Sequence, residues 1–272
     1  MSNHCVSYAY FRSPQSVYEK EKGNAAKQFE QFLPLLVRCH QLLWEGFDLV
    51  IHHDNEVTSL PYWPALSRMA SAGLLKLIPC GKAEKLCEAM LWRMKPVWSG
   101  GYSTVTCRDI DTIPAPFDRR LVMEWLESGK AVSVVHWCSA HSGVMGGTTS
   151  VRSKRFQELL GYGSWEAFIT DNSWCSLRAH GDDQHVLNRL YPRFANETLI
   201  HDLHHAVGDM PGAEVRTRIR DGDDPTLRAS FDHGFADHLS KGCGVCWDPK
   251  EALAFYDAIK SPVIDQIREM EK

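Results

Sequence analysis

The chain has 272 residues, of which 44% are hydrophobic and 24% are charged, and its formal net charge is −4. This balance gives no general electrostatic reason to bind nucleic acid or an anionic membrane, and no apolar run reaches the length that a membrane-spanning helix needs. The length and the ordinary globular composition suit one α/β domain, or a domain with a small appendage, and allow a large core.

The cysteines and the N-terminus bear on the cellular compartment. The nine cysteines are scattered and odd in number, which favours reduced thiols over a disulfide framework. At the N-terminus no charged leader precedes an apolar core, so we expect no signal peptide. Together these observations predict a cytoplasmic protein.

Strand-like and helix-like segments alternate through the first half of the chain. Strands are expected at 6–11, 47–54, 74–79 and 131–137, and in a run from Val105 that ends at the pair Asp109 and Asp111. Helices, recognised by apolar residues spaced three and four apart, are expected at 24–45, 64–72, 82–94 and 117–128. This alternation predicts a Rossmann-like, mostly parallel sheet flanked by helices, with ligands beyond the carboxyl ends of the strands.

The second half is less regular. Gly146 and Gly147 form a pair that either lets the backbone pass close to a ligand or simply makes a turn. Helices are expected at 163–171 and 182–191, a strand at 197–200, and an amphipathic helix at 248–272. Asp182 and Asp183 begin the helix at 182–191, where a carboxylate either caps the helix or serves a functional site.

Two carboxylates follow the run that starts at Val105. Asp109 and Asp111 are two residues apart, and in a strand such residues lie on one face. Converging carboxylates at the carboxyl end of a strand suit Mg²⁺ or Mn²⁺, which prefer oxygen ligands. The alternative is a polar strand exit, in which Asp111 starts a turn and Pro114 ends the strand.

Taken in order, these motifs resemble the GT-A class of nucleotide-sugar-dependent glycosyltransferases. The resemblance covers about residues 5–205 and rests on segments 90–93, 108–111, 141–147 and 181–188. It implies a single glycosyltransferase domain over residues 1–272 with a GT-A-like sheet. About residues 1–140 would form the nucleotide-sugar-binding half, and about 141–272 a less regular acceptor-side half with the C-terminal helix.

The resemblance also implies a reaction. Such enzymes move a hexose or pentose from a nucleoside-diphosphate sugar to a hydroxyl acceptor, which here would be a glycan or, less favoured by the acidic balance, a hydroxylated DNA base. Their Asp-x-Asp pair holds Mn²⁺ or Mg²⁺ against the two phosphates. Carried over to this chain, the metal ligands are Asp109 and Asp111, with His201 as the third ligand and His204 as the next choice.

Other site residues follow from the same resemblance. Glycogenin-like families have a lysine-bearing loop after the histidine, which is not found here, so Arg93 or Arg108 would contact the distal phosphate. Gly146 and Gly147 would let the backbone lie against the donor sugar or the acceptor.

Asp183, with Asp182 as the second choice, is the expected catalytic carboxylate. In an inverting enzyme it would act as the general base. In a retaining enzyme the same residues would orient the donor sugar, and the sequence does not choose between the two outcomes.

Competing interpretations remain open. The chain could be a non-catalytic module that binds sugar nucleotides, or a metal-dependent phosphohydrolase that uses His201, Asp202 and His204. A nucleotidyltransferase would be expected to carry a glycine-rich phosphate loop after the first strand, where segment 12–15 fits poorly.

A separate motif lies near the C-terminus. His233, His238, Cys243 and Cys246 have a spacing compatible with tetrahedral zinc, although a plain glycine- and cysteine-containing turn explains them as well.

Overall fold

The computed structural model describes residues 3–12, 33–82, 85–110, 116–136, 143–172, 182–202 and 210–217. Several predictions from the sequence fall elsewhere in the chain. Asp111, His204, the zinc motif and the C-terminal helix lie outside the described residues, and Asp182 is described by its backbone alone.

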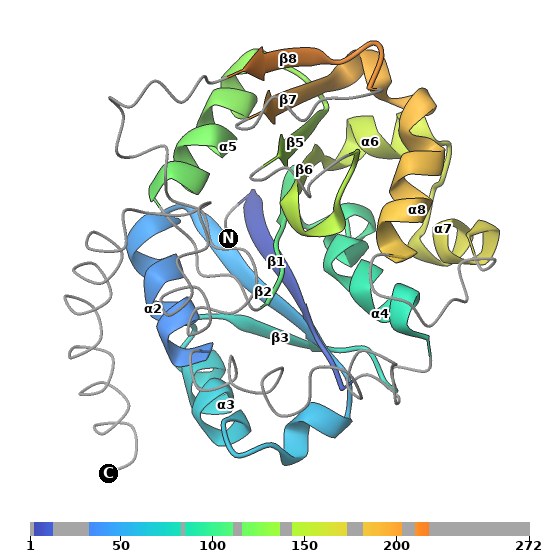
Figure 1. Cartoon of the computed structure of the whole chain (residues 1–272). Coiled ribbons are helices and arrows are strands. Elements are labelled where there is room, and N and C mark those ends of the chain that lie inside the picture. Colours follow the sequence, from blue (N-terminus) through green and yellow to red (C-terminus); the bar gives the residue numbers. More distant parts are fainter. Residues whose placement is uncertain are drawn as a thin grey trace, which may run out of the picture.

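One eight-stranded sheet organises the molecule (Figure 1), in the order β3-β2-β1-β4-β6-β5-β7-β8. Every neighbouring pair is parallel except the two that involve β6, which runs antiparallel to both β4 and β5. The predicted mostly parallel sheet is therefore confirmed, with one reversed strand inside it. The strands are β1 (His4–Tyr10), β2 (Phe47–His53), β3 (Lys76–Pro79), β4 (Thr104–Cys107), β5 (Val132–His136), β6 (Thr149–Arg152), β7 (Thr198–Asp202) and β8 (Glu214–Thr217).

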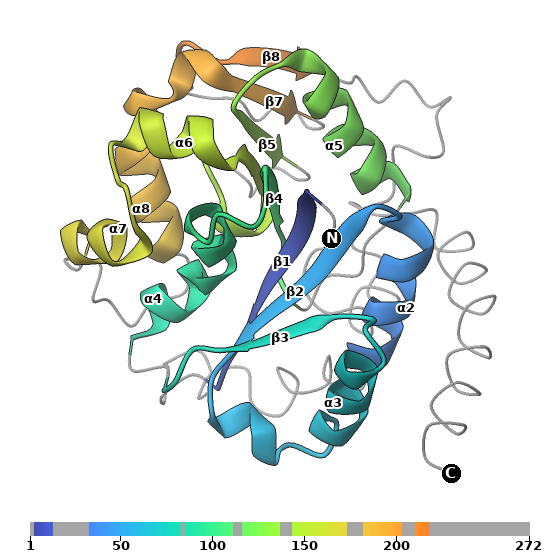
Figure 2. The same cartoon turned by 180° about the vertical axis from the view of Figure 1, so that it is seen from behind.

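Helices cover both faces of the sheet, as the two opposite views show (Figures 1 and 2). One face carries α2 (Leu33–Leu43), α3 (Trp63–Ser71) and α5 (Pro116–Ser128). The other carries α4 (Leu86–Leu91), the 3₁₀ segment η3 (Trp92–Trp98), α6 (Ser153–Leu160), α7 (Trp165–Asp171) and α8 (Asp182–Leu190). We call these the α5 face and the α8 face.

The first strand shows why the sheet needs helices on both of its faces. Residues Cys5 to Tyr10 of β1 are all buried, so the strand has no solvent side. Its side chains alternate, with Val6 and Tyr8 in the core of the α5 face and Cys5 and Ala9 in the core of the α8 face. A strand apolar on both sides is typical of the middle of a parallel sheet.

The chain order of the strands defines a binding edge. From β1 the chain builds β2 and β3 on one side and then returns to place β4 on the other side of β1. In open α/β sheets ligands bind beyond the carboxyl ends of the strands at such a switch point. Because β6 is reversed, it begins at the same edge at which β4 and β5 end.

Some boundaries and elements differ from the expectation. The helix predicted at 82–94 is shorter and continues as the 3₁₀ segment η3, which contains Pro96, a residue that cannot donate a backbone hydrogen bond. Helix α6 and strand β8 were not predicted. Within the described ranges, no helix is long and apolar enough to cross a membrane.

The cysteines agree with the sequence expectation at four positions. Cys5, Cys39, Cys80 and Cys107 are free thiols. The expectation is wrong for Cys87, which is disulfide-bonded.

Candidate functional site

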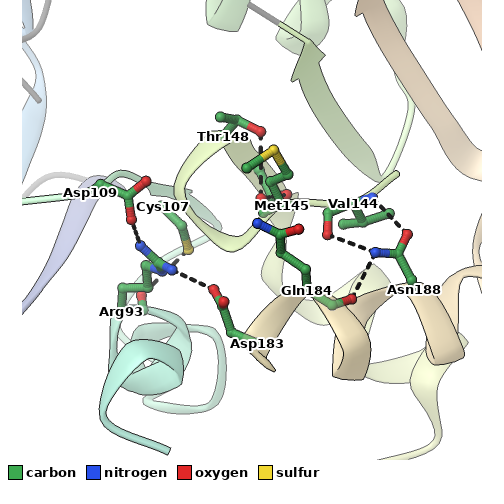
Figure 3. Close-up of polar contacts among 10 residues, drawn as sticks. Arg93, Cys107, Asp109, Val144, Met145, Thr148, Asp183, Gln184 and Asn188 are labelled. Carbon is green, nitrogen blue, oxygen red and sulfur yellow. Dashed lines mark hydrogen bonds and ion pairs between the residues drawn. The ribbon is translucent and has the colours of Figure 1, made fainter. Parts of the chain in front are cut away.

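A buried arginine joins two carboxylates at the binding edge (Figure 3). Arg93 Nη1 donates a hydrogen bond to Asp109 Oδ1, and Arg93 Nη2 donates to Asp183 Oδ2 across 2.5 Å. Arg93 belongs to η3, Asp109 follows the end of β4, and Asp183 is in the first turn of α8. Three segments that are distant in the sequence therefore meet in one network, which we call the Arg93 bridge.

The charges of the Arg93 bridge are held away from water. The side chains of Arg93 and Asp183 are only 4% and 2% exposed. Burial by itself would lower the pKa of Arg93, but the negative charges of Asp109 and Asp183 outweigh it and raise the pKa above its ordinary value. Arg93 therefore stays charged between the two carboxyl groups.

Two polar atoms of the bridge have hydrogen-bonding capacity left. Within the described part of the chain, Asp183 Oδ1 and Arg93 Nε are buried without a hydrogen-bond partner. Buried polar atoms are nearly always paired in native proteins, so this acceptor and this donor are unusual in lacking a partner. A hydroxyl group, which both donates and accepts, suits this pair.

Asp109 is the exposed end of the network. Its side chain is 39% exposed, whereas its two partners are buried. A carboxylate is a ligand that Mg²⁺ and Mn²⁺ prefer, so Asp109 fits the predicted metal chemistry. Among the described residues, no group of three His, Cys, Asp or Glu side chains gathers closely enough to hold a metal ion. Asp111, the second predicted ligand, lies outside them, and its role stays a prediction.

His201 lies on the other face of the sheet. It is completely buried in β7, and its Nε2 is 3.5 Å from Oε2 of Glu124 on α5. Leu199, two residues earlier on the same side of the strand, packs in the core of the α5 face. Asp109 contacts Arg93 on the α8 face, so the described residues do not bring His201 and Asp109 together. A shared metal site for these two residues stays a prediction.

Arg108 is engaged in a structural ion pair. Its Nε and Nη2 donate to Asp118 on α5 at 2.9 and 2.6 Å, and its Nη1 donates to the backbone carbonyl of Cys107 at 2.7 Å. Both members of the pair are buried. Arg108 therefore fastens the end of β4 to α5, and a phosphate contact by this residue stays a prediction. Arg93 points to the other face, toward the carboxylates.

The predicted glycine pair packs against the Arg93 bridge. A Cβ added at Gly146 would lie 2.7 Å from Arg93 Nη2 and closer still to Asp183 Oδ2. At Gly147 it would lie 2.6 Å from Asp109 Oδ1 and closer still to Oδ2 of the same carboxylate. Only glycine lets this backbone approach both carboxylates at once. The groups that this backbone approaches are Arg93, Asp109 and Asp183. The approach to a donor sugar or an acceptor stays a prediction.

The comparisons with known proteins concern the fold. No protein-family model matches the chain, and no curated protein matches it. Among solved structures, a cytidylyltransferase from Leptospira borgpetersenii is similar over 97% of each chain, with 10% identity and a TM-score of 0.50. This likeness supports the Rossmann-like fold.

Two other solved structures are similar at lower TM-scores. A nucleotide-diphospho-sugar transferase from Desulfovibrio desulfuricans has 16% identity and a TM-score of 0.45, over 98% of this chain and 99% of that one. A mannosyltransferase from Pyrobaculum calidifontis, solved with GDP-Man and Mn²⁺, has 12% identity and a TM-score of 0.40, over 80% of this chain and 58% of that one.

Proposed function

We propose that the chain is a metal-dependent glycosyltransferase that moves a sugar from a nucleoside-diphosphate sugar to a hydroxyl acceptor. The observation that carries the proposal is the Arg93 bridge at the switch-point edge of the sheet. It combines an exposed carboxylate, Asp109, with a buried acceptor and donor, Asp183 Oδ1 and Arg93 Nε, that suit a sugar hydroxyl.

Asp109, together with Asp111, would hold Mn²⁺ or Mg²⁺, which would stabilise the negative charge of the departing diphosphate. The oxygen ligands suit these ions, and the exposure of Asp109 leaves room for a ligand on its outer side. His201 faces Glu124 on the α5 face whereas Asp109 contacts Arg93 on the α8 face, so we rank His201 behind the two aspartates.

Asp183 is the carboxylate best suited to the transfer itself. Arg93 holds its Oδ2, which leaves Oδ1 to accept a proton or a hydrogen bond from a hydroxyl group. In an inverting reaction this atom would take the proton of the acceptor hydroxyl. In a retaining reaction it would orient the donor sugar.

A glycan is the proposed acceptor. The net charge of −4 gives a DNA acceptor no electrostatic support.

The phosphohydrolase alternative is weakened by geometry, because His201 and Asp202 are consecutive residues of β7 and point to opposite faces of the sheet. The likeness to a cytidylyltransferase makes nucleotidyl transfer the other candidate reaction. However, segment 12–15 of this chain lacks the glycines that the phosphate loop of a nucleotidyltransferase would need.

One experiment separates these functions. The protein is incubated with Mn²⁺ and a panel of nucleoside-diphosphate sugars, and slow donor hydrolysis is followed by mass spectrometry. A parallel incubation with nucleoside triphosphates and sugar phosphates is assayed for pyrophosphate release. Metal-dependent donor hydrolysis that is lost in Asp111→Asn supports the proposal. Pyrophosphate release would identify a nucleotidyltransferase, and neither activity together with no nucleotide-induced thermal shift would refute both enzyme assignments.

A further inference from the structure

The glycines of the candidate site belong to a short loop that is fastened at its beginning. We define the glycine loop as residues 143–148. The side chain of Asn188 on α8 accepts a hydrogen bond from Val144 N at 2.8 Å and donates from Nδ2 to Val144 O at 3.4 Å (Figure 3). The ring Nε2 of His136, the last residue of β5, lies 2.7 Å from Gly143 O. The loop therefore starts from a fixed point.

The orientation of the Asn188 amide is fully specified. Besides its two contacts with Val144, Nδ2 donates to Gln184 O, one turn earlier in α8, at 2.8 Å. Thus the amide oxygen and both amide hydrogens are used, although the residue is exposed. We call the two hydrogen bonds between the Asn188 amide and Val144 the Asn188 clasp. Gly143 has a φ of +72°, and a Cβ there would clash with the Asn188 amide, so the clasp also requires glycine at this position.

Helix α8 also contacts the glycine loop at a second point. Asp183 and Asn188 both belong to α8, and the Asp183 carboxylate packs against Gly146 while the Asn188 amide binds Val144. Gly147, the next residue, packs against Asp109. Because α8 carries both the clasp and the carboxylate, the position of the loop relative to the Arg93 bridge depends on Asn188.

We infer that Asn188 is a positioning residue of the candidate site: its clasp on Val144 presses Gly146 and Gly147 against the Arg93 bridge and so fixes the separation of Asp109 and Asp183. Asn188 contacts the loop and has no role on the reacting atoms. The kinetic part of this inference rests on the proposed function, whereas the structural part does not.

The structural part is tested by hydrogen exchange. In Asn188→Ala we expect the amides of the glycine loop to exchange roughly fivefold faster, the factor that corresponds to the loss of one hydrogen bond. The matched control is Ser164→Ala. It removes another side chain that accepts an exposed backbone hydrogen bond, from Ala167 N at 3.1 Å, on the same face but at the start of α7. Unchanged exchange in the loop of Asn188→Ala, or equal acceleration in the control, would overturn the inference.

The kinetic part is tested by separating kcat from KM. We expect Asn188→Ala to lower the kcat of donor hydrolysis about tenfold with little change in KM, because a small displacement of catalytic groups affects turnover more than donor binding. Asn188→Asp keeps the acceptor for Val144 N but loses the donor to Val144 O and Gln184 O, so it should change loop exchange and kcat in the same direction as Asn188→Ala. Compared with the wild type, it decides the question if Asn188→Ala does not fold. Faster loop exchange with an unchanged kcat would contradict the positioning role. If wild-type protein lacks donor hydrolysis, the proposed function fails, and the exchange experiment still decides the role of the clasp.

Discussion

Arg93 Nη2 and Asp183 Oδ2 lie 2.5 Å apart although 90 residues separate them in the sequence. The pair connects η3 to the first turn of α8 and is almost fully buried. A buried carboxylate tolerates this position only while a cation neutralises it. The pair is therefore both a structural link between two elements and the means by which a charged carboxylate is kept at the binding edge.

Removing the positive charge of Arg93 should destabilise the fold. We expect Arg93→Met to lower the free energy of unfolding by about 3 kcal/mol, because it leaves Asp183 buried without a compensating charge. Urea denaturation monitored by tryptophan fluorescence measures the change. The control is Arg155→Met, whose exposed ion pairs with Glu158 and Glu197 should contribute little. Equal denaturation midpoints for Arg93→Met and the wild type would mean that the buried pair does not form in solution.

A methyl group at the glycine pair should disturb the site. In Gly147→Ala the new Cβ would overlap the Asp109 carboxylate, so we expect a loss of about 2 kcal/mol in stability and weaker metal-dependent nucleotide binding. The control is Gly163→Ala, since a Cβ there meets nothing within 4 Å. Thermal unfolding and isothermal titration calorimetry with Mn²⁺ and a nucleoside diphosphate measure the two effects. Wild-type behaviour of Gly147→Ala would show that the loop does not approach Asp109 as described.

Neutralising Asp183 should separate transfer from donor binding. We expect Asp183→Asn to reduce transfer about 100-fold or more, because an amide cannot accept a proton from a hydroxyl group. The amide keeps the size of the side chain, so the affinity for the donor should change little. Steady-state kinetics and titration of the donor measure the two quantities. A loss confined to donor affinity would instead assign Asp183 to donor orientation.

The stability of the fold should fall in mild acid. Burial lowers the pKa of His52 from 6.5 to about 3, and the charge of Lys95 acts in the same direction. Between these pH values the unfolded chain binds a proton that the folded chain does not, so stability is complete above about pH 6.5 and decreases as the pH falls through this window. We expect His52→Leu to show a smaller loss of unfolding free energy between about pH 7.5 and about pH 5 than the wild type. Equal losses would mean that another group controls the acid sensitivity.

Much of the sheet could be predicted from local patterns. The strands β1, β2 and β5 are short runs of apolar residues bounded by polar ones, and their positions agree with the prediction within two residues. The reversal of β6 could not be predicted, because strand direction depends on partners that are distant in the sequence. Helix α6 was missed because its eight residues include only three apolar ones, Phe156, Leu159 and Leu160, which are too few to establish a helical period.

The residues of the Arg93 bridge could be selected from the sequence, but their contacts with one another could not. Asp109, Asp183, Arg93 and the glycine pair could be selected from the sequence, because each stands at the end of an element or in an unusual local composition. Nothing local indicates that Arg93 joins the two carboxylates, since that contact exists only once η3, β4 and α8 have packed. For the same reason the sequence could not show that Arg108 pairs with Asp118 whereas Arg93 pairs with Asp109 and Asp183.

The reversed strand β6 also limits how far the length of the glycine loop can differ among related chains. The loop leads directly into β6, where Val151 pairs with Val105 on one side and with Val132 on the other. Inserting or deleting one loop residue would shift β6 by one position and exchange the faces of Ser150 and Val151, which would remove a valine from the core of the α8 face. The register of β6 in the sheet thus fixes the number of residues in the loop. Related chains should therefore vary this part of the site by substitution and keep the number of residues constant.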